Sequence, residues 1–245
     1  MYELYFQKIN ELLGLINKME KETIKAAGEK IAQSIQNEGI VHVFGCGHSH
    51  ILGEEVFYRA GGLAPINPIL IPDLMLHKGA VRSSNLEKKD DYADQFLPDL
   101  DIRPEDAMLV VSTSGRNPVP IDVAQFAKQQ EATVITISSH IYTKNISSRH
   151  KSGRYLSDYA DIAIDNHIPT GDALLELSSS VVPFGPGSTV IGTAIINGIM
   201  VEAINHMVKT SFLPPIFKSS NTDGAVEHNR YLIDKYKSRI PLLEN

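Results

Sequence analysis

The segment 107–130 constrains the fold of this chain more than any other stretch. Ala107–Val111 is a short apolar run with β-branched residues at its end, as expected of a buried parallel strand. Four residues rich in hydroxyl groups follow, Ser112–Gly115, and then a run with helical spacing, Val119–Gln130, for which Asn117 is a reasonable N-cap. A strand, a hydroxyl-rich turn and a helix in this order predict an α/β fold with an anion site at the helix N-terminus.

A second turn of the same kind occurs earlier in the chain. Gly45–Ser49 lies between an expected strand, Ile40–Phe44, and an expected helical run, Ile51–Ala60. Either turn taken alone is equally well explained as a capped turn with no ligand. Two such turns in one α/β chain indicate a single ligand held from two strand ends, at a switch point of a parallel sheet.

The two turns resemble those of the SIS (sugar isomerase) domain family, which binds phosphosugars, and the resemblance extends over about residues 30–210. Ser112–Gly115 with Asn117 looks like the phosphate-binding signature of that family, and Ser49 stands at its phosphate-binding serine. Phosphoheptose isomerases and N-acetylmuramic acid 6-phosphate etherases are the most similar subfamilies. The implied ligand is a phosphorylated sugar or amino sugar. The residues expected to bind its phosphate are Gly47, His48, Ser49, Ser112, Thr113, Ser114, Arg116, Asn117, Ser188 and Thr189.

Composition limits the class of protein. With 245 residues, 42% apolar and 21% charged, the chain can bury a large core, and two cooperating turns favour one domain over residues 1–245. The net charge of −6 argues against nucleic acid as a partner. Cys46 is the only cysteine, which excludes an internal disulfide. No signal segment or long apolar segment is evident, so we expect a cytoplasmic protein that does not contact a membrane.

Cys46, His48 and His50 are potential metal ligands that stand at alternate positions near the first turn. Alternate residues of an extended segment lie too far apart for one tetrahedral ion unless the turn folds them together. We therefore expect no metal and no cofactor. The histidines are then expected to face the ligand, or His50 to cap the following helix.

The expected architecture is a three-layer α/β/α sandwich with a mainly parallel sheet of about five strands. A long helix over residues 3–37 precedes it, and a helical tail over residues 213–245 follows it. The first helix either lies across its own domain or packs on another subunit. The family resemblance favours the second alternative and implies a homodimer or homotetramer.

Three residues are candidates for proton transfer. Glu87 lies in a segment that resembles the one carrying a catalytic glutamate in the etherases, although an exposed acidic stretch explains it equally well. His228 has an ordinary pKa near neutrality, but it could also lie idle on a C-terminal helix. Glu55 follows the first turn by about one helical turn and is the third candidate, though a solvated charge is the commoner explanation. Arg59 stands where both subfamilies tend to have a catalytic glutamate, and an arginine cannot act as a base near neutral pH.

These residues leave three functions open. Aldose–ketose isomerisation is preferred, because it needs one base and one sugar. Ether cleavage by a lyase is an alternative with the same base. A phosphosugar sensor without turnover is the other alternative, and Arg59 favours it. The basic segment 140–154 is expected to be either a solvated loop or a lid over the site.

Overall fold

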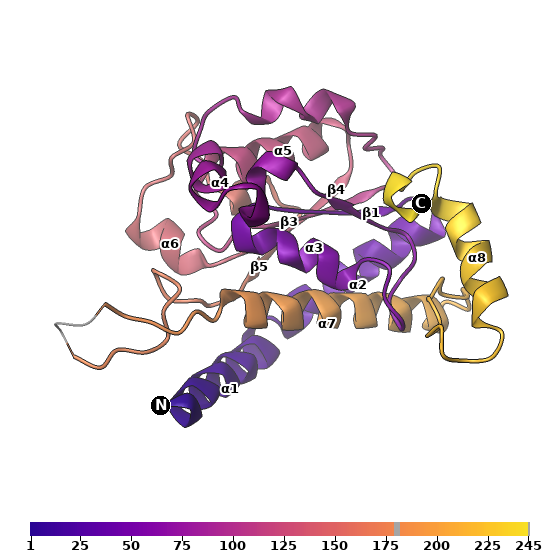
Figure 1. Cartoon of the computed structure of the whole chain (residues 1–245), viewed down its shortest axis with the longest axis horizontal. Helices are drawn as coiled ribbons and strands as arrows, with labels where there is room; N and C mark the ends of the chain where they lie inside the picture. Colours follow the sequence, from indigo (N-terminus) through magenta and orange to yellow (C-terminus); the bar gives the residue numbers. More distant parts are fainter. Residues whose placement is uncertain (179–181, 245) are drawn as a thin grey trace.

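A five-stranded sheet forms the middle layer of the computed structural model, which describes residues 1–178 and 182–244 (Figure 1). All four strand pairs are parallel, in the order β2-β1-β3-β4-β5. The strands are β1 Val41–Gly45, β2 Ile66–Ile69, β3 Ala107–Val111, β4 Thr133–Ser138 and β5 Ile162–Asp165. The predicted α/β/α sandwich with a parallel sheet of about five strands is confirmed.

Helices cover both faces of the sheet because alternate strand residues point to opposite sides. In β3, Ala107, Leu109 and Val111 join the core formed with α2, α3 and α7. Met108 and Val110 join a second core with α5. Both faces are apolar, as expected of a parallel sheet between two helical layers. The helices that cover it are α2 Lys21–Gln36, α3 Ile51–Val56, α5 Pro118–Gln129 and α7 Ser188–Lys209.

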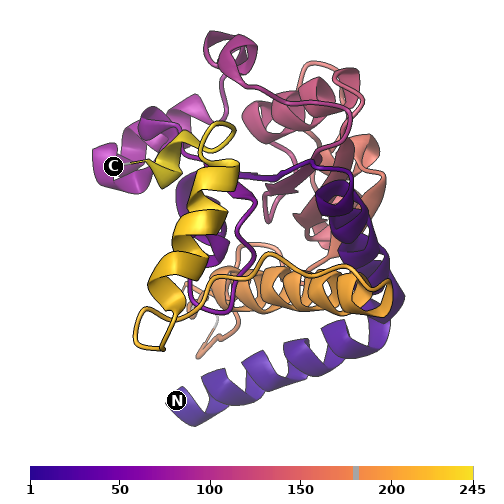
Figure 2. The same cartoon turned by 90° about the vertical axis from the view of Figure 1, so that its right-hand side faces the viewer.

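The prediction of one helix over residues 3–37 is wrong. The segment forms two helices, α1 Tyr2–Met19 and α2, which meet at Glu20. The backbone of Glu20 leaves the helical region (φ −103°, ψ 7°), and its carboxylate lies 2.9 Å from Nε2 of His167, beyond the end of β5. In Figures 1 and 2, α1 projects away from the sheet, whereas α2 runs along it.

Other boundaries also differ from expectation. α3 ends at Val56 instead of Ala60, because Phe57 adopts an extended conformation (ψ 136°). The expected loop 140–154 begins with a short helix, α6 His140–Asn145. The two remaining α-helices within the described residues are α4 Ala80–Leu86 and α8 Ala225–Tyr236.

The expectation that the chain has no long apolar segment is wrong, because α7 is such a segment. Its length and a mean hydropathy of 1.3 are sufficient for a membrane span, and it is the one such helix among the residues described. Its buried residues, such as Ile195, Ile196 and Ile199, instead form part of the core beneath the sheet. α7 is therefore a core helix in this fold.

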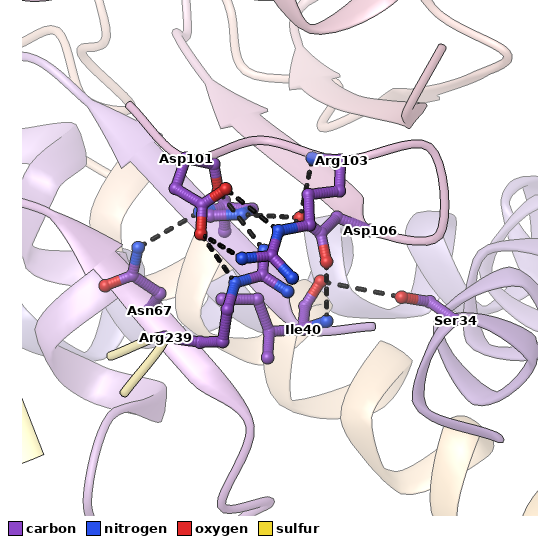
Figure 3. A network of polar contacts seen from close by, with 8 residues as sticks. Ser34, Ile40, Asn67, Asp101, Arg103, Asp106 and Arg239 are labelled. Carbon is purple, nitrogen blue, oxygen red and sulfur yellow. Dashed lines mark hydrogen bonds and ion pairs between the residues drawn. The ribbon is translucent and has the colours of Figure 1, made fainter. Parts of the chain in front are cut away.

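The amino ends of the strands are held by a buried carboxylate, that of Asp106 (Figure 3). It accepts hydrogen bonds from the N–H groups of Ile40 (2.8 Å) and Arg103 (2.9 Å) and from Arg239 (2.7 Å), and it lies 3.1 Å from Nε2 of His42. Arg239 follows α8. The network therefore fixes the C-terminal segment at the edge of the sheet opposite the two polar turns.

Candidate phosphate-binding site

The two polar turns begin side by side. Gly45, the last residue of β1, pairs in register with Val111, the last residue of β3. In the strand order β2-β1-β3-β4-β5, β2 lies on one side of β1, whereas β3, β4 and β5 follow on the other side. The strand order therefore reverses between β1 and β3, which flank the switch point of the sheet. Crevices at such points are the usual ligand sites of open parallel sheets. We call the two turns, residues 45–49 and 112–117, the first loop and the second loop.

The first loop is tightly folded. A Cβ on Gly45 would lie 2.6 Å from the carbonyl carbon of Ser49, so only glycine allows the chain to close on itself there. His50 is buried, and its Nδ1 contacts the carbonyl oxygen of Gly47, so this side chain braces the loop and does not face a ligand. His48 is exposed. Ser49 is half-buried, and its hydroxyl has no partner among the residues described.

The second loop presents unpaired backbone donors. Gly115 has a φ of +57°, which favours glycine, and its carbonyl accepts the N–H of Leu156 at 2.8 Å. The carbonyl of Thr113 accepts the N–H of Ser139 at 2.8 Å. Within the described residues, the N–H groups of Thr113, Ser114 and Arg116 have no hydrogen-bond partner. These donors, together with the loop hydroxyls, are suited to an anion.

The first turn of α5 contributes less than the sequence analysis expected. Asn117 is the N-cap residue as predicted, but its side chain makes no capping bond. Pro118 and Pro120 have no N–H, and the N–H of Val119 donates to the backbone oxygen of Glu87 at 3.3 Å. The N–H donors for an anion are therefore in the loop before the helix.

The second loop contains one arginine, Arg116, and contacts another, Arg149. The backbone N–H of Arg149 donates to the carbonyl of Arg116 at 2.9 Å, which docks the basic segment against the loop. Nε of Arg116 is buried, with no partner among the described residues. Burial and the nearby charge of Arg149 lower the pKa of Arg116 below its usual value. A guanidinium in this environment is stabilised by a bound anion.

Glu87 lies at the end of α4, next to both loops. Its Oε1 accepts a hydrogen bond from Nδ2 of Asn117 at 2.8 Å. Burial raises the pKa of the Glu87 carboxyl, although Asn117, Lys88 and Arg149 oppose the rise. Burial and the Glu87 charge also raise the pKa of the Cys46 thiol well above its usual value, so Cys46 remains a thiol at neutral pH.

Glu55 is occupied by other residues. It pairs with Arg59, and Nδ2 of Asn197 in α7 donates to its Oε1 at 3.0 Å. The arginine found at the expected position of a catalytic glutamate thus neutralises the neighbouring carboxylate.

His228 does not join the loops. It lies in α8, and its Nε2 is 2.8 Å from the carbonyl oxygen of Ile216. In Figure 1, α8 is at the opposite end of the molecule from α4 and α6. Within one chain, His228 and Glu87 are therefore separated, and a joint action of the two residues stays a prediction.

Some donors at the start of α7 are already paired within the protein and are not free to bind a ligand. Gly187 is the N-cap residue of α7, and Ser188 is the first residue of the helix. Asp172 accepts the hydroxyl of Ser188 (2.6 Å) and the N–H groups of Gly187 (3.0 Å) and Ser188 (2.9 Å). An aspartate at this position takes the place that an anionic ligand would have. Thr189 is half-buried next to this cap.

Sequence reasoning missed Arg149 as a site residue. Its signal was the basic segment that follows β4, which the sequence analysis singled out only as a loop or a lid. Its contact with Asn117 depends on a fold that brings together residues 32 positions apart. Among the residues described, no group of three or more histidine, cysteine, aspartate or glutamate side chains is arranged to hold a metal ion.

Comparisons with known proteins show which families and structures this chain is similar to. The model of the SIS domain family matches residues 4–139. UPF0309 protein BH0227 of Halalkalibacterium halodurans is 54% identical over 243 residues, which cover 99% of this chain and 97% of the relative. UPF0309 protein GK1441 of Geobacillus kaustophilus is 56% identical over 243 residues, which cover 99% of this chain and 97% of that relative. Among solved structures, phosphoheptose isomerase GmhA from Neisseria gonorrhoeae shares 14% identity, with a TM-score of 0.49 over 81% of this chain and 94% of that chain.

Proposed function

The chain belongs to the SIS domain family, and on that premise we propose that it is an aldose–ketose isomerase of a phosphorylated sugar or amino sugar. The observation that carries the proposal is the position of Glu87, a largely enclosed carboxylate with a raised pKa, held against the phosphate-type second loop by Asn117. A raised pKa makes Glu87 a stronger base than an ordinary glutamate.

The phosphate is proposed to bind between the two loops. The unpaired N–H groups of Thr113 and Ser114, the hydroxyl of Ser49 and the guanidinium of Arg116, whose Nε is buried without a partner among the described residues, are its donors. The net charge of −6 does not oppose this, because local donors hold one phosphate.

The chemistry needs one base. The Glu87 carboxylate removes the proton from C2 of the aldose phosphate, the C–H electron pair forms the C1–C2 double bond, and O1 takes a proton from a water molecule to give an enediol. Glu87 then returns its proton to C1, and O2 gives its proton to water as the C2 carbonyl forms. An ether-cleaving lyase needs, in addition, an acid for the leaving oxygen. Glu55 is paired with Arg59 and His228 lies elsewhere, so isomerisation is favoured over ether cleavage.

Deuterium exchange tests the proposal. A panel of aldose and ketose phosphates, with and without an acetamido group, is incubated with the protein in heavy water, and exchange at C2 of the aldoses and C1 of the ketoses is followed by NMR. We expect exchange with at least one sugar, and its loss by at least 100-fold in Glu87→Gln with binding retained. Glu29→Gln, which replaces an exposed carboxylate on α2, is the matched control and should exchange like the wild type.

The Arg59–Glu55 pair supports a second candidate function, a phosphosugar sensor without turnover. It places a cation where the resemblance implies a catalytic carboxylate. Binding of a sugar phosphate without exchange for any member of the panel would establish the sensor and exclude the isomerase.

A further inference from the structure

Three residues from three segments form one chain of hydrogen bonds at the site. Nη1 of Arg149 donates to Oδ1 of Asn117 at 3.0 Å, and Nδ2 of Asn117 donates to Oε1 of Glu87 at 2.8 Å. Arg149 follows α6, Asn117 precedes α5 and Glu87 follows α4. Asn117 is 7% exposed, so its amide has little access to water as an alternative partner.

The guanidinium decides which way the amide faces. The two ends of an asparagine amide have nearly the same shape, and the oxygen and nitrogen differ only in accepting or donating hydrogen bonds. A guanidinium donates and never accepts, so the end of the amide that faces Arg149 must be the oxygen. The NH2 group then necessarily faces Glu87. An NH2 group beside a carboxyl favours the ionised form of that carboxyl.

Without Arg149 the amide has a second orientation. Its oxygen would face Glu87, and it would accept a hydrogen bond from a protonated carboxyl, which then could not take a proton from a substrate. The other charged or titratable groups near Glu87 are Lys88, on its own segment, and Cys46, in the first loop. Within the described residues, neither Lys88 nor Cys46 forms a hydrogen bond with the Asn117 amide, so neither orients that amide.

We propose that Arg149 is a positioning residue that orients the Asn117 amide and thereby keeps Glu87 ionised and ready to accept a proton. This role rests on the proposed function of Glu87 as the base. It also makes the basic segment part of the catalytic arrangement, since Arg149 is held by its backbone bond to Arg116.

The test is a titration of the Glu87 carboxyl by carbon NMR in the ligand-free protein, with the signal assigned from Glu87→Gln. In Arg149→Met, which keeps much of the side-chain volume but removes the donors, we expect the pKa of Glu87 to rise. Arg149→Lys restores a group that only donates, and it should return the pKa toward the wild-type value. The matched control is Arg154→Met on the same segment, whose cation lies over the Tyr159 ring, and it should leave the titration unchanged.

A double-mutant cycle separates the relay from the direct effect of the Arg149 charge. If Arg149 acts through Asn117, Arg149→Met should shift the pKa of Glu87 much less in an Asn117→Ala background than in the wild type. An equal shift in both backgrounds would overturn the relay. If Asn117→Ala does not fold, the side-chain NH2 signals of Asn117 in the full-length wild type serve instead. The chemical shifts of these NH2 signals should change with pH in step with the titration of Glu87. Chemical shifts that stay constant through that titration would contradict the relay.

The outcomes distinguish this inference from the proposed function. If the wild type exchanges deuterium but Arg149→Met leaves both the titration and the pH profile of exchange unchanged, the relay is wrong and the isomerase stands. If the titration behaves as expected but no sugar phosphate exchanges, the isomerase is wrong, and Arg149 positions a carboxylate that serves binding only.

Discussion

Nδ2 of Asn117 lies 2.8 Å from Oε1 of Glu87, although the two residues are 30 positions apart in the chain. This contact joins the second loop to the end of α4. The N–H of Val119, two residues further on, donates to the backbone oxygen of Glu87 at 3.3 Å and reinforces the same junction. The proposed phosphate donors and the proposed base therefore belong to one connected unit, and a bound phosphate fixes the distance between the sugar chain and the carboxylate.

Removing a hydroxyl from a loop is expected to weaken phosphate binding. A hydrogen bond to a charged group contributes about 1.5–3 kcal/mol, so Ser49→Ala should lower the affinity for a sugar phosphate by about 10-fold or more. Isothermal titration calorimetry measures this effect. Thr222→Ala, an exposed threonine that precedes α8, is the matched control and should bind like the wild type. Equal affinities for all variants would place the phosphate elsewhere.

Glu87→Gln is expected to stabilise the protein near neutral pH. Burial raises the pKa of Glu87 in the folded state, so the stability that this group contributes is complete below its unfolded-state pKa and is lost as the pH rises through the folded-state pKa. Glutamine keeps an oxygen for Asn117 without the buried charge. We expect a gain of about 1 kcal/mol, or roughly 2–4 °C in melting temperature, at pH 8 and little difference at pH 4. A variant less stable than the wild type at pH 8 would contradict this account.

Asp106→Asn is expected to destabilise the fold by about 3 kcal/mol, because Arg239 and His42 lose a buried carboxylate. Burial favours a higher pKa for Asp106, but hydrogen bonds from His42, Ile40 and Arg103 outweigh it and lower the pKa. The stabilisation is therefore present above the unfolded-state value of about 3.9 and is lost as the pH falls through the folded-state pKa.

Urea unfolding between pH 2 and pH 7 checks both parts of that prediction. The wild type should lose stability steeply in acid, and Asp106→Asn should show a flatter profile that meets it at low pH. Asp99→Asn, an exposed aspartate on the preceding segment, is the matched control. Parallel profiles for the wild type and Asp106→Asn would show that the network in Figure 3 contributes nothing specific.

The projecting helix α1 is expected to mediate self-association. Tyr2 and Phe6 are 70% and 59% exposed, their ring centroids lie 6.0 Å apart, and Figure 1 shows α1 projecting away from the sheet. Large apolar side chains gathered on one helix face commonly mark an interface. Tyr2→Glu combined with Phe6→Glu should lower the molar mass measured by light scattering, whereas Lys8→Glu should not. A wild-type protein that is monomeric at all concentrations would refute this expectation.

The sequence predicted the layers and the loops well for a physical reason. Apolar runs such as Ala107–Val111 and Thr133–Ser138 are buried on both faces, and hydroxyl-rich turns with glycine are local signals. The break at Glu20 has no local glycine or proline to signal it, and the contact of Glu20 with His167 joins residues 147 positions apart. The pairing of Glu55 with Asn197 and the distance of His228 from the loops are likewise set by packing between remote segments. Arg149 was missed because nothing in its own neighbourhood indicates that it contacts Asn117.

Backbone amide NMR of the nitrogen-15-labelled protein tests the central claim most directly. The protein is titrated with inorganic phosphate and then with the panel of sugar phosphates. The account predicts saturable shifts of the amide signals of Gly47, Thr113 and Ser114, from both loops together and at the same apparent affinity. Shifts confined to one loop, or saturable shifts only at residues remote from both, would contradict a shared phosphate site between β1 and β3.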